Sequence, residues 1–234
     1  MFGMFGGPMF FDWHYFLWLA PALLLAFWAQ MRVKATYAAA QQEPAPLSGA
    51  AAARHILDSA GLQNVEIEEI PGVLSDHYDS QAKVLRLSTD VYRNCSVAAV
   101  GIAAHESGHA LQDAQHYPAL VIRNAAVPAA SFGSSISYVL ILAGFFLQTG
   151  VLIWAGIGLF ACVVFFQLVN LPVEFNASSR AKAQLVALGI VDQQQLHYVN
   201  KVLDAAAWTY VAATLQSVLT LLYYVSRFSG QGRD

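Results

Sequence analysis

The sequence predicts an α-helical integral membrane protein with about four transmembrane helices and a small cytoplasmic α+β domain. The first observation is composition: 57% of the residues are hydrophobic and 12% are charged, whereas soluble domains carry about 25% charged residues. The second is that three apolar stretches come close to, or exceed, the roughly 20 residues that a membrane helix needs. The third is that most Lys and Arg residues lie between these stretches.

The first apolar stretch runs from about residue 13 to residue 31, and Arg32 and Lys34 follow it directly. A secretory signal peptide is the alternative, but the stretch has no basic start and no small-residue cleavage site after it. We therefore predict a retained N-terminal membrane anchor over residues 1–34.

The second stretch covers about residues 132–170, which is long enough for two helices, and Gln148-Thr149-Gly150 forms a polar break between them. This pattern predicts a transmembrane hairpin over residues 132–170. The third stretch, about residues 208–225, predicts a C-terminal transmembrane helix over residues 207–227. A buried helix of a soluble core is its alternative, because several Thr, Ser and Gln residues dilute it.

Positive charge sets the predicted orientation, since loops rich in Lys and Arg stay in the cytoplasm. Seven of the 12 Lys and Arg residues lie between Arg32 and Arg123, and three more lie between the hairpin and the last span. Residues 32–131 and 171–206 are therefore expected in the cytoplasm, with both chain ends outside. No run of basic residues suggests nucleic-acid binding. The two cysteines are far apart and have no metal-binding or redox spacing.

The cytoplasmic part predicts short helices and strands. Period-two alternation and turn residues indicate the strands, Gly61 is suited to end the first helix, and Pro118 marks the end of the second. In chain order the expected elements are a linker over 41–49, a helix over 50–60, a strand over 65–70, a hairpin with arms 73–78 and 83–87, and a helix over 96–115.

Residues 105–109 have the sequence His-Glu-Ser-Gly-His, the form H-E-x-x-H, midway along the last predicted helix. Four residues of helix turn through about 400° and rise about 6 Å, so both imidazoles leave one face and can bind one ion. Glu106 can hold a metal-activated water without binding the metal itself. The motif predicts zinc at His105 and His109, with Glu106 as general base in peptide hydrolysis. A solvent-facing helix is the alternative, but small flanking residues indicate a buried one, where these side chains would be costly without a metal.

A catalytic zinc takes a third protein ligand and leaves its fourth position to water. Glu174 is the only carboxylate between Asp113 and Asp192, and it directly follows the predicted hairpin. Because a hairpin crosses the membrane twice, it returns the chain to the side that carries His105 and His109. We therefore expect Glu174 to be the third ligand, and a solvated interfacial carboxylate is the alternative.

The chain resembles the neutral zinc metallopeptidases of bacterial membranes, the YugP type, a gluzincin-like family with the H-E-x-x-H motif. The resemblance covers most of the chain. The segments that carry it are Leu74-Ser-Asp-His-Tyr-Asp79, Leu87-Ser88, Ser96-Val-Ala-Ala-Val-Gly-Ile-Ala-Ala-His-Glu-Ser-Gly-His-Ala-Leu-Gln112, and Leu171-Pro-Val-Glu-Phe-Asn-Ala-Ser178 with Arg180.

The resemblance implies a zincin-like catalytic domain over residues 50–131, completed by a second segment over 171–206. It implies Zn²⁺ as cofactor at His105, His109 and Glu174, with Glu106 as base. Together with the distribution of Lys and Arg, it predicts a multi-pass protein of the inner (cytoplasmic) membrane whose active site faces the cytoplasm. The chain also looks like a distant relative of membrane proteases that commonly carry Asp four residues after the ligand glutamate. This chain has Ser178 at that position.

A peptidase also needs a donor that stabilises the oxyanion of its tetrahedral intermediate. We expect Arg180 and His77 to act as catalytic residues in this role, with Tyr78 and His197 as further candidates. Arg180 could instead be an ordinary positive-inside residue, and the acidic residues around His77 could shape a turn.

The leading hypothesis is a zinc-dependent endopeptidase whose partners are the lipid bilayer and protein or peptide substrates, membrane proteins among them. In peptidases of similar form an edge strand binds the peptide as an added strand, and the strand over 83–87 is the expected one. A non-proteolytic zinc-binding scaffold or adaptor is the second hypothesis, although a scaffold has no need for Glu106. A zinc transporter is the third, but residues 132–171 contain no carboxylate or His for a passing ion.

Overall fold

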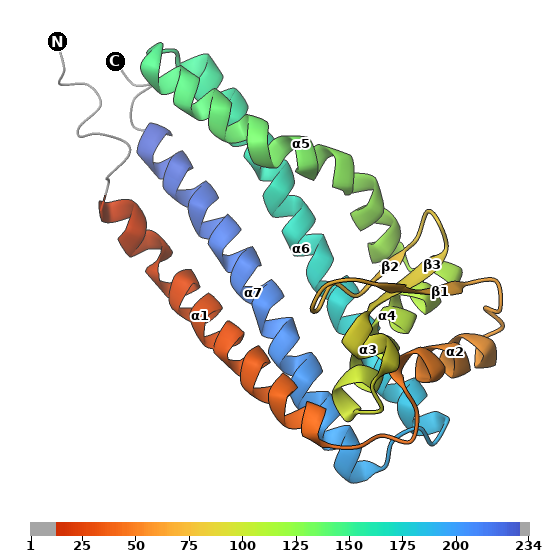
Figure 1. Cartoon of the computed structure of the whole chain (residues 1–234). Coiled ribbons are helices and arrows are strands. Elements are labelled where there is room, and N and C mark those ends of the chain that lie inside the picture. Colours follow the sequence, from red (N-terminus) through yellow and green to blue (C-terminus); the bar gives the residue numbers. More distant parts are fainter. Residues whose placement is uncertain (1–12, 230–234) are drawn as a thin grey trace. The chain divides into compact units, whose positions relative to one another are not determined.

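The computed structural model describes residues 13–229, which form seven helices and one small sheet (Figure 1). The first 12 residues of the predicted anchor lie outside the described residues. The elements are α1 (Trp13–Gln42), α2 (Gly49–Ser59), β1 (Glu66–Ile70), β2 (His77–Asp79), β3 (Val84–Ser88), α3 (Thr89–Arg93), α4 (Val97–Ala114), α5 (Pro118–Phe146), α6 (Gly150–Ala187) and α7 (Gln193–Ser229).

Four of the described helices, α1, α5, α6 and α7, are long and apolar enough to cross a membrane, as predicted. The break between α5 and α6 falls at the predicted polar residues, where Gln148 has a φ of 53°. The start of α5 differs, because this helix begins at Pro118 and not near residue 132. Proline has no N–H to satisfy in a first helical turn, so Pro118 can start a helix, while α4 has already ended at Ala114.

The chain divides into two compact units. The described part of the first unit comprises residues 13–28, 125–168 and 209–229, and Arg227 is its one Asp, Glu, Lys or Arg residue. Such a composition suits a lipid environment. Its core is a cluster of buried apolar side chains from α5, α6 and α7: Ile141, Ile153, Ile157 and Phe228.

The second unit comprises residues 29–124 and 169–208 and contains the sheet. The strand order is β1-β3-β2, with β1 parallel and β2 antiparallel to β3. The predicted strands and hairpin are therefore present, although β2 is short because residues 71–76 form a loop with positive φ angles at Gly72 and Leu74. The expectation that the strand over 83–87 is an edge strand is wrong, since β3 pairs on both sides. Within the described chain, β2 and β1 form the edges.

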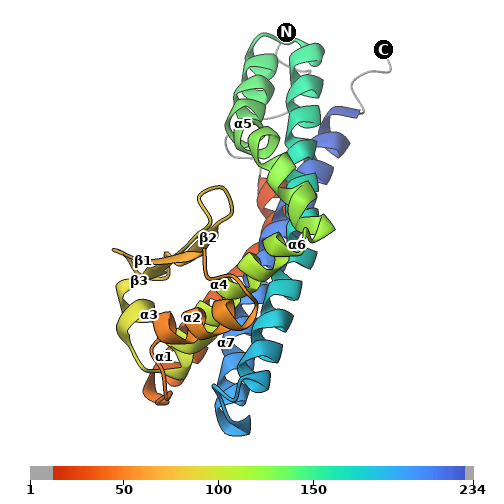
Figure 2. The same cartoon turned by 90° about the vertical axis from the view of Figure 1, so that its right-hand side faces the viewer.

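Helix α4 lies in the middle of the second unit (Figures 1 and 2). The Ser96 side chain caps its start by accepting the N–H of Ala99, and 14 of its 18 residues are buried. One core cluster joins α4 to α2, α3 and the sheet, and another joins it to α2, α6 and α7. The helix predicted over 96–115 is thus confirmed, and its motif is surrounded by protein.

Candidate metal centre

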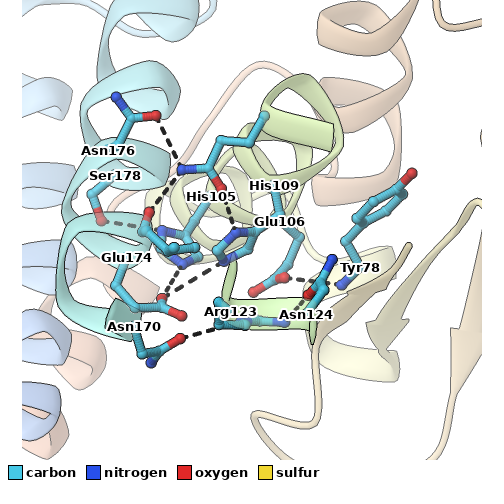
Figure 3. Close-up of polar contacts among 12 residues, drawn as sticks. Tyr78, His105, Glu106, His109, Arg123, Asn124, Asn170, Glu174, Asn176 and Ser178 are labelled. Atoms are coloured by element: carbon cyan, nitrogen blue, oxygen red, sulfur yellow. Dashed lines mark hydrogen bonds and ion pairs between the residues drawn. The ribbon is translucent and has the colours of Figure 1, made fainter. Parts of the chain in front are cut away.

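Three side chains of the second unit converge: His105 and His109 from α4, and Glu174 from α6 (Figure 3). One potential ligand atom from each lies within 4.8 Å of the others. The Oε2 atom of Glu174 is 3.3 Å from His105 Nε2 and 3.6 Å from His109 Nε2. The two imidazole rings are nearly perpendicular, at 86°, with their centroids 4.9 Å apart. The structure therefore brings together the three side chains that the sequence singled out.

This arrangement fits a zinc ion. Tetrahedral zinc with ligand bonds of about 2.0–2.2 Å needs donor atoms about 3.3–3.6 Å apart. Both distances from Glu174 lie in this range. Two imidazole nitrogens and one carboxylate oxygen are also a common donor set of catalytic zinc, with the fourth position open.

The electrostatic surroundings of the cluster favour a cation. His109 and Glu174 are buried. Burial lowers the pKa of His109, but its hydrogen bond to Glu174 and the charges of Glu106 and Glu174 outweigh this, and the net shift is upward. The surroundings of the imidazoles are thus negative, and such a field attracts a divalent metal ion.

The second nitrogen of each imidazole has its own hydrogen-bond partner. His105 Nδ1 lies 3.1 Å from the hydroxyl of Ser178, and His109 Nδ1 lies 3.0 Å from Oε1 of Gln112. Bonds of this kind orient an imidazole so that its other nitrogen faces the metal. Ser178, four residues after Glu174, therefore reaches the imidazole of His105. In the sequence, helical spacing is the signal for both partners. Gln112 lies three residues after His109, and Ser178 lies four residues after Glu174.

Glu106 lies beside the three-residue cluster, on the side of β2. Its side chain is largely buried, and its Oε2 accepts the backbone N–H of Tyr78 at 3.1 Å. The hydroxyl of Tyr78 donates to Asp113 at 2.8 Å, so Tyr78 attaches β2 to α4 at two points. Burial, and then the Asp113 carboxylate, raise the pKa of the Tyr78 hydroxyl, which therefore stays a donor.

Arg180 and His77, the predicted oxyanion donors, have other partners. Arg180 donates from Nε to Asn176 at 2.7 Å and from Nη1 to Gln115 at 2.6 Å. The exposed His77 places Nδ1 2.9 Å from the carbonyl oxygen of Ser75. Neither has a hydrogen bond or ion pair with the three-residue cluster, and their catalytic roles stay predictions.

Arg123 of α5 lies near the cluster and was not singled out in the sequence (Figure 3). Its Nε donates to Asn170 at 3.2 Å and its Nη1 to Asn124 at 2.9 Å. Asn170 is buried and lies one helical turn before Glu174. In the described chain no carboxylate lies within ion-pair distance of Arg123. A cation held by neutral amides keeps its charge available for a ligand. In the sequence, only the four-residue spacing of Asn170 and Glu174 could have indicated that Arg123, the partner of Asn170, lies near the site.

The chain is similar to known proteins over most of its length. A family model described as "Putative neutral zinc metallopeptidase" matches residues 15–229. A curated protein of Bacillus subtilis (strain 168), "Putative membrane protease YugP", is 48% identical over 215 residues, which cover 91% of this chain and 95% of that protein. No solved structure matches the chain significantly.

Proposed function

Because this chain belongs to the neutral zinc metallopeptidase family, we propose that it is a membrane endopeptidase that uses zinc to hydrolyse peptide bonds. The observation that carries the proposal is the convergence of His105, His109 and Glu174 at zinc-binding distances beside the buried carboxylate of Glu106. These three side chains would hold the ion, and Glu106 would be the general base.

Among the side chains of the protein, Glu106 would carry out the proton transfers. Zinc, when bound, supplies a Lewis acid that polarises the peptide carbonyl and makes water a nucleophile near neutral pH. Glu106 takes the proton of the attacking water and delivers it to the leaving nitrogen as the C–N bond breaks. The Tyr78 N–H holds Oε2 of Glu106 and leaves Oε1 to receive that proton.

The substrate is expected along β2. Tyr78 is opposite Leu85 in the antiparallel pair, yet its N–H points to Glu106 and away from β3. The outer edge of β2 therefore faces the proposed base, and an extended peptide could add there as a further strand. On the other edge of the sheet, Glu68 and Glu69 of β1 are in ion pairs with Arg86 and Arg93, and charged side chains discourage strand addition.

The donor that stabilises the oxyanion is proposed among three basic side chains, Arg123, Arg180 and His77. Arg123 has the most direct support, because its guanidinium has no carboxylate partner in the described chain and is fixed by a side chain one turn from Glu174. A guanidinium placed in this way can donate two hydrogen bonds to a carbonyl oxygen that gains negative charge.

We further propose that the second unit lies on the cytoplasmic side of the inner membrane. Ten of the 12 Lys and Arg residues belong to this unit, which is the asymmetry expected of cytoplasmic segments. Cys95 is exposed in this unit. A membrane-impermeant thiol reagent should label it in inverted membrane vesicles and not in intact cells, whereas the reverse result would place the unit outside.

Zinc content and peptide cleavage of the detergent-purified protein test the function. We expect about one zinc per chain in the wild type, in Glu106→Gln and in the control Glu66→Gln, whose carboxylate is exposed on β1. Cleavage should be lost in Glu106→Gln alone. Absence of zinc from the wild type, or full activity of Glu106→Gln, would contradict the proposal. Zinc binding without any cleavage would favour a non-proteolytic scaffold.

A further inference from the structure

A chain of hydrogen-bonded polar side chains begins at His109 and leads away from the metal cluster (Figure 3). His109 Nδ1 is 3.0 Å from Gln112 Oε1, and Gln112 Nε2 is 3.0 Å from Asn176 Oδ1 and 2.8 Å from the carbonyl oxygen of Val173. Arg180 Nε is 2.7 Å from the same Asn176 oxygen. Gln112 is fully buried, so its amide has no water to exchange for these partners.

The donors and acceptors of this chain permit one arrangement. The Nε atom of Arg180 can only donate, so the Asn176 atom that faces it must be the side-chain oxygen. This oxygen and the carbonyl of Val173 can only accept, so the Gln112 atom between them must be its amide nitrogen. The oxygen of Gln112 therefore faces His109, and the Nδ1 of His109 must carry the proton. In the neutral ring Nε2, which lies 3.6 Å from Glu174 Oε2, is then the nitrogen whose lone pair can bind a metal.

We propose that Gln112, held by Asn176 and Arg180, is the positioning residue that fixes the tautomer and ring plane of His109 for metal binding. The inference rests on the proposed zinc site. It gives Arg180 a role that differs from oxyanion stabilisation: its guanidinium sets the orientation of the Asn176 amide, which sets that of Gln112. The outer part of Arg180 donates to Gln115 at the end of α4, so the same side chain ties α6 to α4.

The two histidines differ in this respect. The partner of His105 is the Ser178 hydroxyl, which can either donate or accept. Nothing in that contact decides the tautomer of His105. His109 is thus the preset ligand, and His105 is the one that can adapt when a metal arrives.

Zinc affinity provides a test that does not depend on cleavage. Gln112→Met keeps a side chain of similar size and removes the acceptor of His109. Loss of such a partner weakens metal binding by about 10- to 100-fold, and we expect this shift in competition with a chromophoric chelator. Ser107→Ala is the control, because it also removes a buried polar group from α4, one that in the described part of the chain donates to the carbonyl of Ala103. It should bind zinc as the wild type does.

Arg180→Gln provides a second variant if Gln112→Met proves too unstable to purify. It removes the Nε donor from a partly exposed side chain, and we expect zinc affinity to fall by several-fold with little change in the unfolding temperature. Its control is Lys182→Gln. Lys182 lies two residues after Arg180 on α6, and the substitution breaks its ion pair with Asp204. Equal affinities of Arg180→Gln and Lys182→Gln would contradict the proposed chain.

The tautomer can be observed directly by ¹⁵N NMR of the histidine-labelled, metal-free protein. We expect the proton of His109 on Nδ1 in the wild type and in Ser107→Ala, and exchange between both nitrogens in Gln112→Met. A neutral His109 that carries its proton on Nε2 and not on Nδ1 in the wild type would overturn the inference. This measurement stands even if the wild type binds no zinc, which would contradict the proposed function and not the hydrogen-bond chain.

Discussion

A Cβ atom on Gly108 would lie 2.6 Å from the backbone carbonyl oxygen of Ala177. The motif helix α4 and the ligand-bearing helix α6 therefore touch backbone to backbone at this point, between His105 and His109 on one side and just after Glu174 on the other. The second variable position of the H-E-x-x-H motif is thus occupied by the one residue type that lets the two helices approach this closely.

Gly108→Ala should separate α4 from α6 and weaken zinc binding. The contact is with backbone, which cannot rotate away, so the added methyl must displace a helix. Overpacking of this kind costs about 1–3 kcal/mol. Chelator competition should show a loss of zinc affinity, and chemical denaturation in detergent should show a lower free energy of unfolding.

Gly101→Ala is the matched control, seven residues earlier on the same helix. Its Cβ would meet the Val199 side chain at 3.4 Å, an ordinary contact. Since alanine is the better helix former, this variant should be equal to the wild type or up to about 1 kcal/mol more stable. Similar losses in both variants would show that glycine at position 108 is not needed for the helix contact.

Tyr78→Phe should loosen β2 without affecting the metal ligands. The change removes the hydroxyl that donates to Asp113 and keeps the backbone N–H that holds Glu106. A hydrogen bond to a carboxylate contributes about 1.5–3 kcal/mol. We expect a lower free energy of unfolding, unchanged zinc affinity and a higher KM for peptides. Tyr92→Phe, on α3, is the control, and an equal change in KM there would exclude a specific role for Tyr78.

The parts of the site that sequence could predict depend on local geometry. His105 and His109 share a face because they are four residues apart on a helix, whatever surrounds that helix. Glu174 was predictable because a hairpin returns the chain to the side that it left. The start of α5 at Pro118 was not predicted, because proline can end one helix or begin the next. Local sequence does not distinguish these two roles.

The remaining contacts depend on how distant segments pack. Gln112 and Asn176 are 64 residues apart and meet because α4 lies against α6. The central position of β3 likewise follows from its parallel pairing with β1, and no turn motif in the sequence indicates this pairing. Arg123 is near the site through Asn170, and neither residue belongs to a motif. Side-chain partners of this kind require the three-dimensional structure.

Asp79 should make the hairpin between β2 and β3 sensitive to acid. Its carboxylate accepts the N–H groups of Ala82 and Gln81 and pairs with Arg86, and these bonds lower its pKa to about 2. Because the pKa is lower in the folded state, the stabilisation is complete above about pH 4 and is lost as the pH falls towards 2.

The measurement is the unfolding temperature of the wild type and of Asp79→Asn across that pH range. Asparagine can still accept the turn N–H groups, so the difference between the two isolates the charge. The wild type should be more stable at pH 5, and the two should converge near pH 2. A constant difference from pH 5 to pH 2 would rule out the carboxylate as its source.

The oxyanion donor can be identified by comparing Arg123→Gln, Arg180→Gln and His77→Gln at full zinc occupancy. Loss of a donor that acts in the transition state lowers kcat by about 10²- to 10³-fold and leaves KM nearly unchanged. We expect this result for Arg123→Gln, with zinc affinity as in the wild type, because Arg123 is connected to the site through its hydrogen bond to Asn170. For Arg180→Gln the principal change should be in zinc affinity, as it acts through Gln112. A loss of kcat in His77→Gln alone would instead assign the role to the exposed imidazole at the edge of the sheet.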